Sequence, residues 1–130
     1  MIEALVLTHG KIGGEMVKVV EMILGPLPGL QAASNEGLSA RQTAAVVGDW
    51  INSLPEPTQG LLLIDEHGGS CATAARLGGT EDAGIPVLSG VNLAMLLAFV
   101  TWREDLGRGE LVQRIVDQGR KAVAVIGGAR

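Results

Sequence analysis

A histidine stands at the end of the first apolar segment of the chain. His9 follows the apolar residues 4–7 and Thr8, and it precedes Gly10. Imidazole is the one side chain whose unperturbed pKa lies near neutrality, so it serves as a base, a metal ligand or a nucleophile. In open α/β sheets, chemistry takes place at the carboxyl ends of parallel strands. We therefore predict that His9 is the reactive residue.

Asp65 is the acid that we expect beside His9, because it follows a second apolar run, residues 60–64. An imidazole that attacks with one ring nitrogen needs the other nitrogen held as N–H by an acceptor. A carboxylate at the end of a neighbouring strand does this and sets both the tautomer and the ring orientation. The alternative for His9 is a partly exposed turn histidine without a chemical role.

The segment Gly68-Gly69-Ser70 opens a predicted helix. Two glycines allow backbone N–H groups to approach an anion closely, and the N-terminus of a helix adds about half a positive charge. The hydroxyl of Ser70 is a further donor. The segment therefore indicates a cradle for a phosphoryl group, and an ordinary tight turn is the alternative.

A third strand end carries Gly90 and Asn92, after the short apolar run of residues 86–88. One interpretation is a turn followed by a helix N-cap, a position that asparagine favours. The other interpretation has Asn92 bracing the loop around His9. Both remain open from the sequence.

His9, Asp65, Glu66 and His67 also form a candidate set of nitrogen and oxygen ligands for a divalent metal. Adjacent side chains rarely point to one centre, so we predict no metal and no cofactor here. Cys71 has no second thiol with which to pair, and we expect it to serve in helix packing rather than as a nucleophile.

The composition excludes several classes of protein. The chain has 130 residues and is 47% hydrophobic, which predicts one globular domain, residues 1–130, with a core of its own. The net charge of −4 without a basic patch argues against nucleic acid and anionic membranes as partners. A single cysteine suits a reducing compartment. No signal peptide or run of about 20 apolar residues is present, so we expect a cytoplasmic protein.

Alternating strands and helices must position these residues. The alternation with short connections predicts βαβ units and an α/β fold with a mostly parallel sheet. The expected strands are residues 2–7, 30–33, 60–64 and 86–88, with a further strand-like run at 122–126; the expected helices are residues 13–24, 39–54, 70–77, a segment from 92 onward, and 109–118. In the first helix, Ile12, Met16, Val19, Val20 and Ile23 recur at helical spacing.

With its strand ends considered together, the chain resembles the IIA component of the mannose-family bacterial phosphotransferase system (PTS). The similar segments are THG at 8–10, EMILG at 21–25, LID at 63–65, GGS at 68–70 and GVNLAML at 90–96. The resemblance covers almost the whole chain. It implies a doubly wound three-layer sandwich with sheet order 2-1-3-4. It also implies that residues 122–126 form an antiparallel strand exchanged across a homodimer.

The resemblance further implies a function. The histidine that matches His9 accepts a phosphoryl group from the phosphocarrier HPr, which is charged from phosphoenolpyruvate through enzyme I. It then passes the group to a histidine of a IIB partner, which phosphorylates a sugar entering through a membrane IIC/IID complex. The matching Asp65 orients the imidazole, and Ser70 with the backbone amides near it holds the phosphoryl group. Gly68 and Gly69 are expected to bind the phosphoryl group together with Ser70. Supporting roles are expected for Thr8, Gly10, Gly90 and Asn92.

Two positions depart from the family pattern, which often has an aromatic residue at His67 and an uncharged one at Glu66. A carboxylate close to a phosphoryl group would repel it, so we expect Glu66 to point outward and to help select the partner. His67 either shapes the turn or tunes the electrostatics of the site.

The 130 residues contain no IIB region, so we expect any IIB component to be a separate chain. Several other functions stay open at this point. They are a stand-alone regulatory IIA-like protein, the phosphoryl donor subunit of a dihydroxyacetone kinase, a non-enzymatic interaction module, and a metal- or nucleotide-dependent enzyme.

Overall fold

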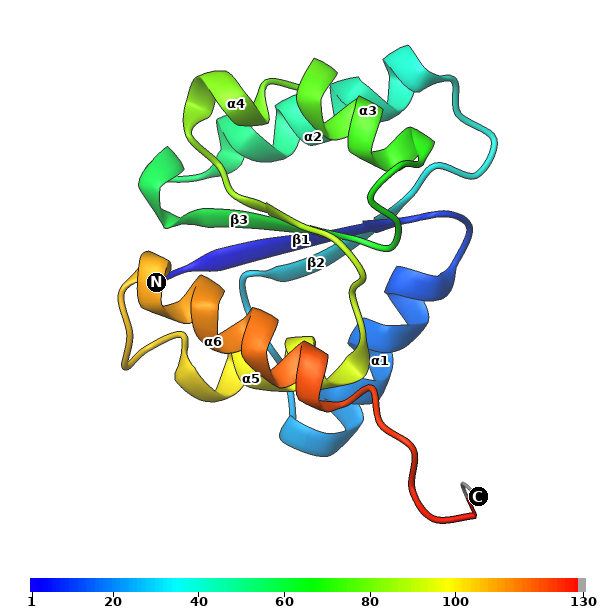
Figure 1. Ribbon diagram of the computed structural model, residues 1–130. Helices are drawn as coiled ribbons and strands as arrows, with labels where there is room; N and C mark the ends of the chain where they lie inside the picture. Colours follow the sequence, from blue (N-terminus) through cyan, green and yellow to red (C-terminus); the bar gives the residue numbers. More distant parts are fainter. Residues whose placement is uncertain (129–130) are drawn as a thin grey trace.

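Four strands form one parallel sheet in the order β2-β1-β3-β4 (Figure 1). The computed structural model describes residues 1–128. The predicted α/β fold and the order 2-1-3-4 are confirmed. The central strands β1 and β3 are neighbours in the sheet although 51 residues lie between the end of β1 and the start of β3. The strands are β1 (Glu3–Thr8), β2 (Leu30–Ser34), β3 (Gly60–Ile64) and β4 (Val87–Leu88).

Helices cover both faces of this sheet. Figure 1 shows α2, α3 and α4 on one side of the sheet and α1, α5 and α6 on the other. None of the helices within residues 1–128 is long and apolar enough to cross a membrane. The helices are α1 (Ile12–Leu24), α2 (Ala40–Ser53), α3 (Ser70–Leu77), α4 (Thr80–Ala83), α5 (Leu93–Trp102) and α6 (Arg108–Lys121), and a short 3₁₀ helix spans Pro57–Gln59. The four residues of α4 were not predicted, because a single turn shows no periodicity.

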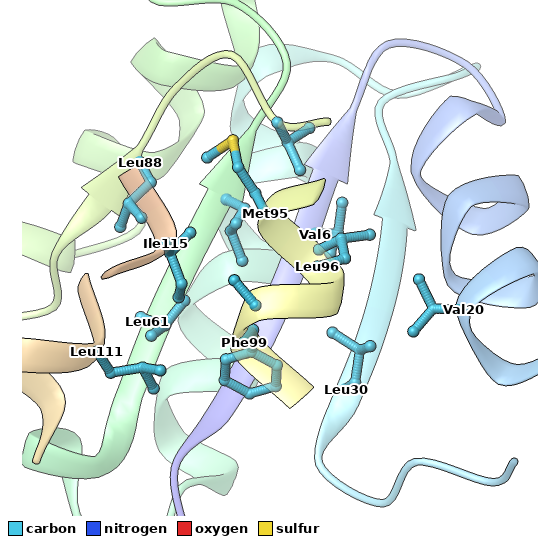
Figure 2. Close-up of a cluster of buried hydrophobic side chains, with 14 of the residues drawn as sticks. Val6, Val20, Leu30, Leu61, Leu88, Met95, Leu96, Phe99, Leu111 and Ile115 are labelled. Atoms are coloured by element: carbon cyan, nitrogen blue, oxygen red, sulfur yellow. The ribbon is translucent and has the colours of Figure 1, made fainter. Parts of the chain in front are cut away.

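The sheet separates two apolar layers, because successive side chains of a strand point to opposite faces. Every residue of β3 is buried, as expected for a strand covered on both sides. The larger layer lies between the sheet and helices α1, α5 and α6, where Val6 and Leu61 lie near Leu96 and Phe99 (Figure 2). The smaller layer joins the other face to α2 and α3 and comprises Leu5, Leu7, Val47, Trp50, Leu54, Leu62, Ile64, Cys71, Ala75 and Ile85.

Helix α1 buries a face that only partly overlaps the one that its periodicity suggested. Val20 and the partly buried Met16 pack against the core as expected, together with Val17, whereas Ile12, Val19 and Ile23 are exposed. Both sets have helical spacing, so the pattern predicts the helix but does not decide which apolar side meets the sheet.

Residues 122–126 do not form the predicted fifth strand within the chain. The backbone N–H groups of Ala122 and Val123 bond to Gln118 and Arg120, which extends the last turn of α6. Val125 and Ile126 then lie 76% and 95% exposed. A strand needs a partner for its backbone groups, and among residues 1–128 this segment has none. Exchange across a homodimer stays a prediction, since it requires a second chain.

Arg103, a buried residue at the end of α5, connects this helix to the segments just before β1 and β2. Its guanidinium donates to the carbonyl of Ile2 and, at 2.8 Å, to that of Pro28, and it stacks 4.7 Å from the centre of the Phe99 ring. Only 6% of the residue is exposed. The side chain therefore supplies donors to carbonyl groups that the sheet and α1 leave unpaired.

We expect Arg103→Met to lower the free energy of unfolding by about 3 kcal/mol, because two carbonyl groups lose a charged donor in a buried place. Arg41→Met is the matched control, since Arg41 is exposed on α2 and its loss should change stability by less than about 0.5 kcal/mol. Urea denaturation measures both values. Equal stability of the two variants would contradict the role of Arg103.

Candidate active site

Three strand ends meet at the carboxyl edge of the sheet. In β1 and β3, Leu7 pairs with Ile64, so the residues that follow these strands emerge side by side. In β1 and β2, Thr8 pairs with Ser34, which brings the end of β2 to the same edge. From the central strands β1 and β3, the sheet order leads outward to β2 on one side and to β4 on the other. Open α/β sheets bind their ligands at such a switch point between the two central strands.

Asp65 holds His9 through two hydrogen bonds to one carboxylate oxygen. The backbone N–H of His9 and its ring atom Nδ1 each lie 2.9 Å from Asp65 Oδ2. An ionised carboxylate only accepts, so the proton of a neutral imidazole resides on Nδ1 and the lone pair on Nε2. The structure therefore brings together the histidine and the acid that were predicted as a pair.

The pKa of Asp65 is set by opposing effects. Burial by itself raises the pKa of the carboxyl, but the hydrogen bonds from the backbone and side chain of His9, with its charge, outweigh burial and lower the pKa overall. The carboxylate is thus ionised at neutral pH. The His9 side chain is 42% exposed against 18% for Asp65, so the acid lies behind a ring whose other side is open to solvent.

Ser70 and Asn35 complete the hydrogen-bonded chain on the outer side of the ring. Ser70 Oγ lies 3.1 Å from His9 Nε2, and the Asn35 amide donates to this hydroxyl at 3.2 Å. The side-chain oxygen of Asn35 accepts a hydrogen bond from the backbone N–H of Gly10 at 3.2 Å. Since Nε2 carries the lone pair, the hydroxyl proton of Ser70 points toward it.

Asn35 was missed in the sequence. Asn35 directly follows β2, which ends at Ser34, one residue later than the predicted strand 30–33. The apolar pattern of this strand is weak because β2 is an edge strand with partly exposed residues. In the structure this edge strand pairs with β1, and that pairing delivers Asn35 to the loop that carries His9.

The N-terminus of α3 faces the imidazole across Gly69. A Cβ atom built on Gly69 would lie 3.0 Å from His9 Cε1 and 3.5 Å from Nε2, so a methyl group there would displace the ring by a few tenths of an ångström. The first backbone N–H groups of a helix have no partner within the helix and carry partial positive charge. This close approach of glycine backbone is therefore suited to hold an anion on Nε2. Nothing lies within 4 Å of the corresponding position on Gly68.

We expect Gly69→Ala to slow any transfer through His9 by roughly tenfold, since displacing reactive groups by a fraction of an ångström is costly. Gly68→Ala is the matched control one residue away, where a methyl group meets open space and the rate should stay within about twofold. Single-turnover kinetics compare the two. Similar rates for both variants would exclude the close packing of Gly69 as a requirement.

Thr8 and Gly10 shape the loop around His9. Thr8 is fully buried, and its Oγ1 accepts the backbone N–H of Gly13 at 2.8 Å, close to the start of α1. Gly10 has a φ of +59°, a conformation that L side chains rarely adopt. These two residues therefore fix the direction in which the chain leaves β1 on either side of His9.

Gly90 and Asn92 lie in the loop before α5 and make no hydrogen bond to His9 among the described residues. Asn92 accepts the backbone N–H of Met95 as the N-cap of α5, and its amide donates to Gly119 of α6. The structure thus favours the N-cap interpretation. Val91 connects this loop to the site edge, because its N–H bonds to the carbonyl of Ile64, the residue before Asp65.

Glu66 and His67 are both exposed. Glu66 does not simply point outward, because its Oε2 lies 3.2 Å from the Cβ position on Gly69 that also contacts the His9 ring. A carboxylate thus borders the proposed phosphoryl position. Among residues 1–128, the ligand atoms that lie within 4.8 Å of one another belong to His9, Asp65 and Cys71, so Glu66 and His67 are not part of this cluster.

Cys71, by contrast, lies directly beside the pair. Its Sγ is 4.0 Å from His9 Nδ1, and the residue is fully buried in the smaller apolar layer. Burial, with a smaller contribution from the charge of Asp65, raises the pKa of the thiol to about 11. The expected packing role agrees with this burial, but its nearness to His9 and Asp65 was not visible in the sequence.

The arrangement supplies what nucleophilic transfer of an anionic group needs. One ring nitrogen carries a lone pair on the side of the ring away from Asp65, and the other is held by the carboxylate. The Ser70 hydroxyl and Gly69, at the start of α3, lie beside the nitrogen with the lone pair. Phosphoryl transfer depends on such positioning and charge stabilisation more than on covalent machinery.

Residues 3–116 match the family model EIIA-man, described as the PTS system fructose IIA component. No curated protein matches the chain in sequence.

Solved structures agree in fold at low sequence identity. A phosphotransferase system EIIA component from Streptococcus agalactiae has a TM-score of 0.86 and 23% identity, covering 96% of this chain and 97% of that one. A mannose/sorbose-specific IIA subunit from Enterococcus faecalis has a TM-score of 0.82 and 24% identity, covering 99% and 97%. The match over residues 3–116 shows that the chain belongs to the mannose-type EIIA family of the PTS, and the fold agrees with this, which supports a sugar phosphocarrier role.

Proposed function

We propose that His9 Nε2 accepts a phosphoryl group from phosphorylated HPr and passes it to a histidine of a separate IIB component. The observation that carries this proposal is the orientation of one imidazole. Nδ1 is bound to Asp65 at 2.9 Å, while Nε2 lies on the exposed side of the ring next to Ser70 and the start of α3. A IIA component needs this combination of a held nitrogen and a free one.

The transfer is an exchange of one phosphorus–nitrogen bond for another. The lone pair of Nε2 attacks the phosphorus in line with the donor nitrogen, whose bond to phosphorus breaks and whose electron pair returns to the donor ring. The Nδ1 proton stays in its bond to Asp65, and this carboxylate balances the positive charge that develops on the ring. Ser70 turns its hydroxyl from Nε2 to a phosphoryl oxygen, and backbone N–H groups at the start of α3 supply further donors.

We expect the protein to act in the cytoplasm as a homodimer, with membrane IIC and IID proteins as indirect partners. The exposed tail at Val125 and Ile126 supports the dimer, because β4 ends the sheet and offers an edge to an incoming strand. Sedimentation of the purified protein measures the oligomeric state.

Incubation with labelled phosphoenolpyruvate, enzyme I and HPr tests the proposed acceptor function. We expect label on the protein that is lost in acid and retained in base, as for phosphohistidine, and that is chased by addition of a IIB component. Label that withstands acid, or no label while HPr itself is phosphorylated, would refute the proposal.

A further inference from the structure

Three metal-ligating atoms of different chemistry converge at the base of the site. They are Nδ1 of His9, a carboxylate oxygen of Asp65 and Sγ of Cys71, and all lie within 4.8 Å of one another. The closest pair, Nδ1 and Oδ2, is 2.9 Å apart, and Sγ lies 4.0 Å from Nδ1. These residues come from β1, β3 and α3, so the fold alone brings them together.

We propose that His9, Asp65 and Cys71 bind a zinc ion, and that this ion competes with phosphorylation of His9. The second clause rests on the proposed function. One nitrogen, one oxygen and one thiolate sulfur are ligands that Zn²⁺ accepts in tetrahedral sites, with water in the fourth position. Ligand atoms around such an ion lie about 3.3 to 3.5 Å apart. A side-chain shift of roughly half an ångström brings the observed spacing of Nδ1 and Sγ to these values.

A second observation points to an unused ligand atom in the same cluster. Oδ1 of Asp65 is buried and has no hydrogen-bond partner among residues 1–128, whereas Oδ2 accepts two bonds from His9. A buried carboxylate oxygen without a partner is costly, and coordination of a cation is one way to satisfy it. The free oxygen thus allows Asp65 to bind a metal and still accept the backbone N–H of His9.

Zinc binding would reverse the tautomer on which transfer depends. The ion takes the lone pair of Nδ1, so the single proton of the neutral ring moves to Nε2, and the thiol of Cys71 loses its proton to solvent as it coordinates. Nε2–H has no lone pair with which to attack phosphorus. The metal-bound protein is therefore unable to accept a phosphoryl group, and removal of the ion restores the acceptor.

Binding of the metal alone is tested first, without any phosphorylation. Cobalt(II) is used as a spectroscopic probe, and Zn²⁺ affinity is measured by competition with a chromophoric chelator. We expect wild type to show a thiolate-to-cobalt charge-transfer band that Cys71→Ala lacks, and the Zn²⁺ affinity of that variant to fall at least tenfold. His67→Ala is the matched control, because His67 is an exposed histidine outside the cluster and its loss should preserve the band.

Competition is tested with preformed phosphorylated HPr, comparing each protein with and without Zn²⁺. The rate should fall severalfold or more with Zn²⁺ for wild type and His67→Ala and recover with chelator, whereas the ratio for Cys71→Ala should stay near one. Equal Zn²⁺ affinity in wild type and Cys71→Ala, in proteins with matching circular dichroism, would overturn the site. A cobalt–thiolate band in a protein that never accepts phosphate would keep the metal site and refute the phosphocarrier function instead.

Discussion

Replacing His9 with alanine should abolish phosphoryl acceptance from HPr, leaving label at the background of the assay. No other described side chain in the site offers an oriented ring nitrogen, and the hydroxyl of Ser70 lies among the groups that we expect to hold the phosphoryl oxygens. The loss should not come from unfolding. The His9 side chain is 42% exposed, and the backbone N–H that bonds to Asp65 remains in the variant. Labelling with phosphoenolpyruvate, enzyme I and HPr measures the effect.

The matched control for this variant is His67→Ala, which removes the second histidine of the chain two residues after Asp65. His67 is exposed and makes no hydrogen bond to the pair in the described part of the chain, so its loss should leave labelling within about twofold. Label that persists in His9→Ala and disappears in His67→Ala would show that His67 is the acceptor and would overturn the site.

Asp65→Asn should slow phosphoryl transfer on the order of 10²- to 10³-fold while the domain stays folded. In enzymes whose imidazole is held by an aspartate, the same change costs about 10⁴-fold because the wrong tautomer forms. Here the imidazole is the nucleophile and half exposed, so water partly replaces the lost acceptor. An amide oxygen still accepts the His9 backbone N–H, which preserves the loop. Rapid-quench single-turnover kinetics measure the rate, and thermal unfolding checks the fold.

Glu66→Gln makes the same change from carboxylate to amide at the next residue. Its Oε2 borders Gly69 and therefore the expected phosphoryl position, so removing this negative charge should leave the rate unchanged or raise it slightly. Slowing by Asp65→Asn without slowing by Glu66→Gln would separate the specific bond between Asp65 and His9 from the general effect of a nearby charge. Equal slowing by both would contradict the orienting role of Asp65.

The pair of His9 and Asp65 could be predicted because it depends on a rule of topology. Apolar runs at residues 4–7 and 60–64 identify buried strands, and parallel strands deliver whatever follows them to one edge of the sheet. The sheet order then makes β1 and β3 neighbours. Gly69 and Ser70 could also be predicted from the sequence, since a glycine pair before a helix indicates a backbone that approaches a ligand closely.

Asn35 and Cys71 were not predicted as members of the site. Asn35 follows β2, whose residues are partly exposed at the sheet edge, so its sequence carries little strand signal. Cys71 reaches His9 only because α3 packs its first turn against the smaller apolar layer. Contacts of this kind depend on the angle and depth at which a helix meets the sheet, and no local pattern encodes them.

By itself, the sequence determined the alternation of strands and helices, the order of the parallel sheet by resemblance, and the two residues that chemistry requires at its edge. These follow from local periodicity and from strand direction, which are properties of short segments. Only the tertiary structure decided which face of α1 is buried, that residues 122–126 pair with nothing inside one chain, and that Cys71 lies beside His9. Those outcomes depend on how several elements pack at once, because burial and pairing are properties of neighbours distant in sequence.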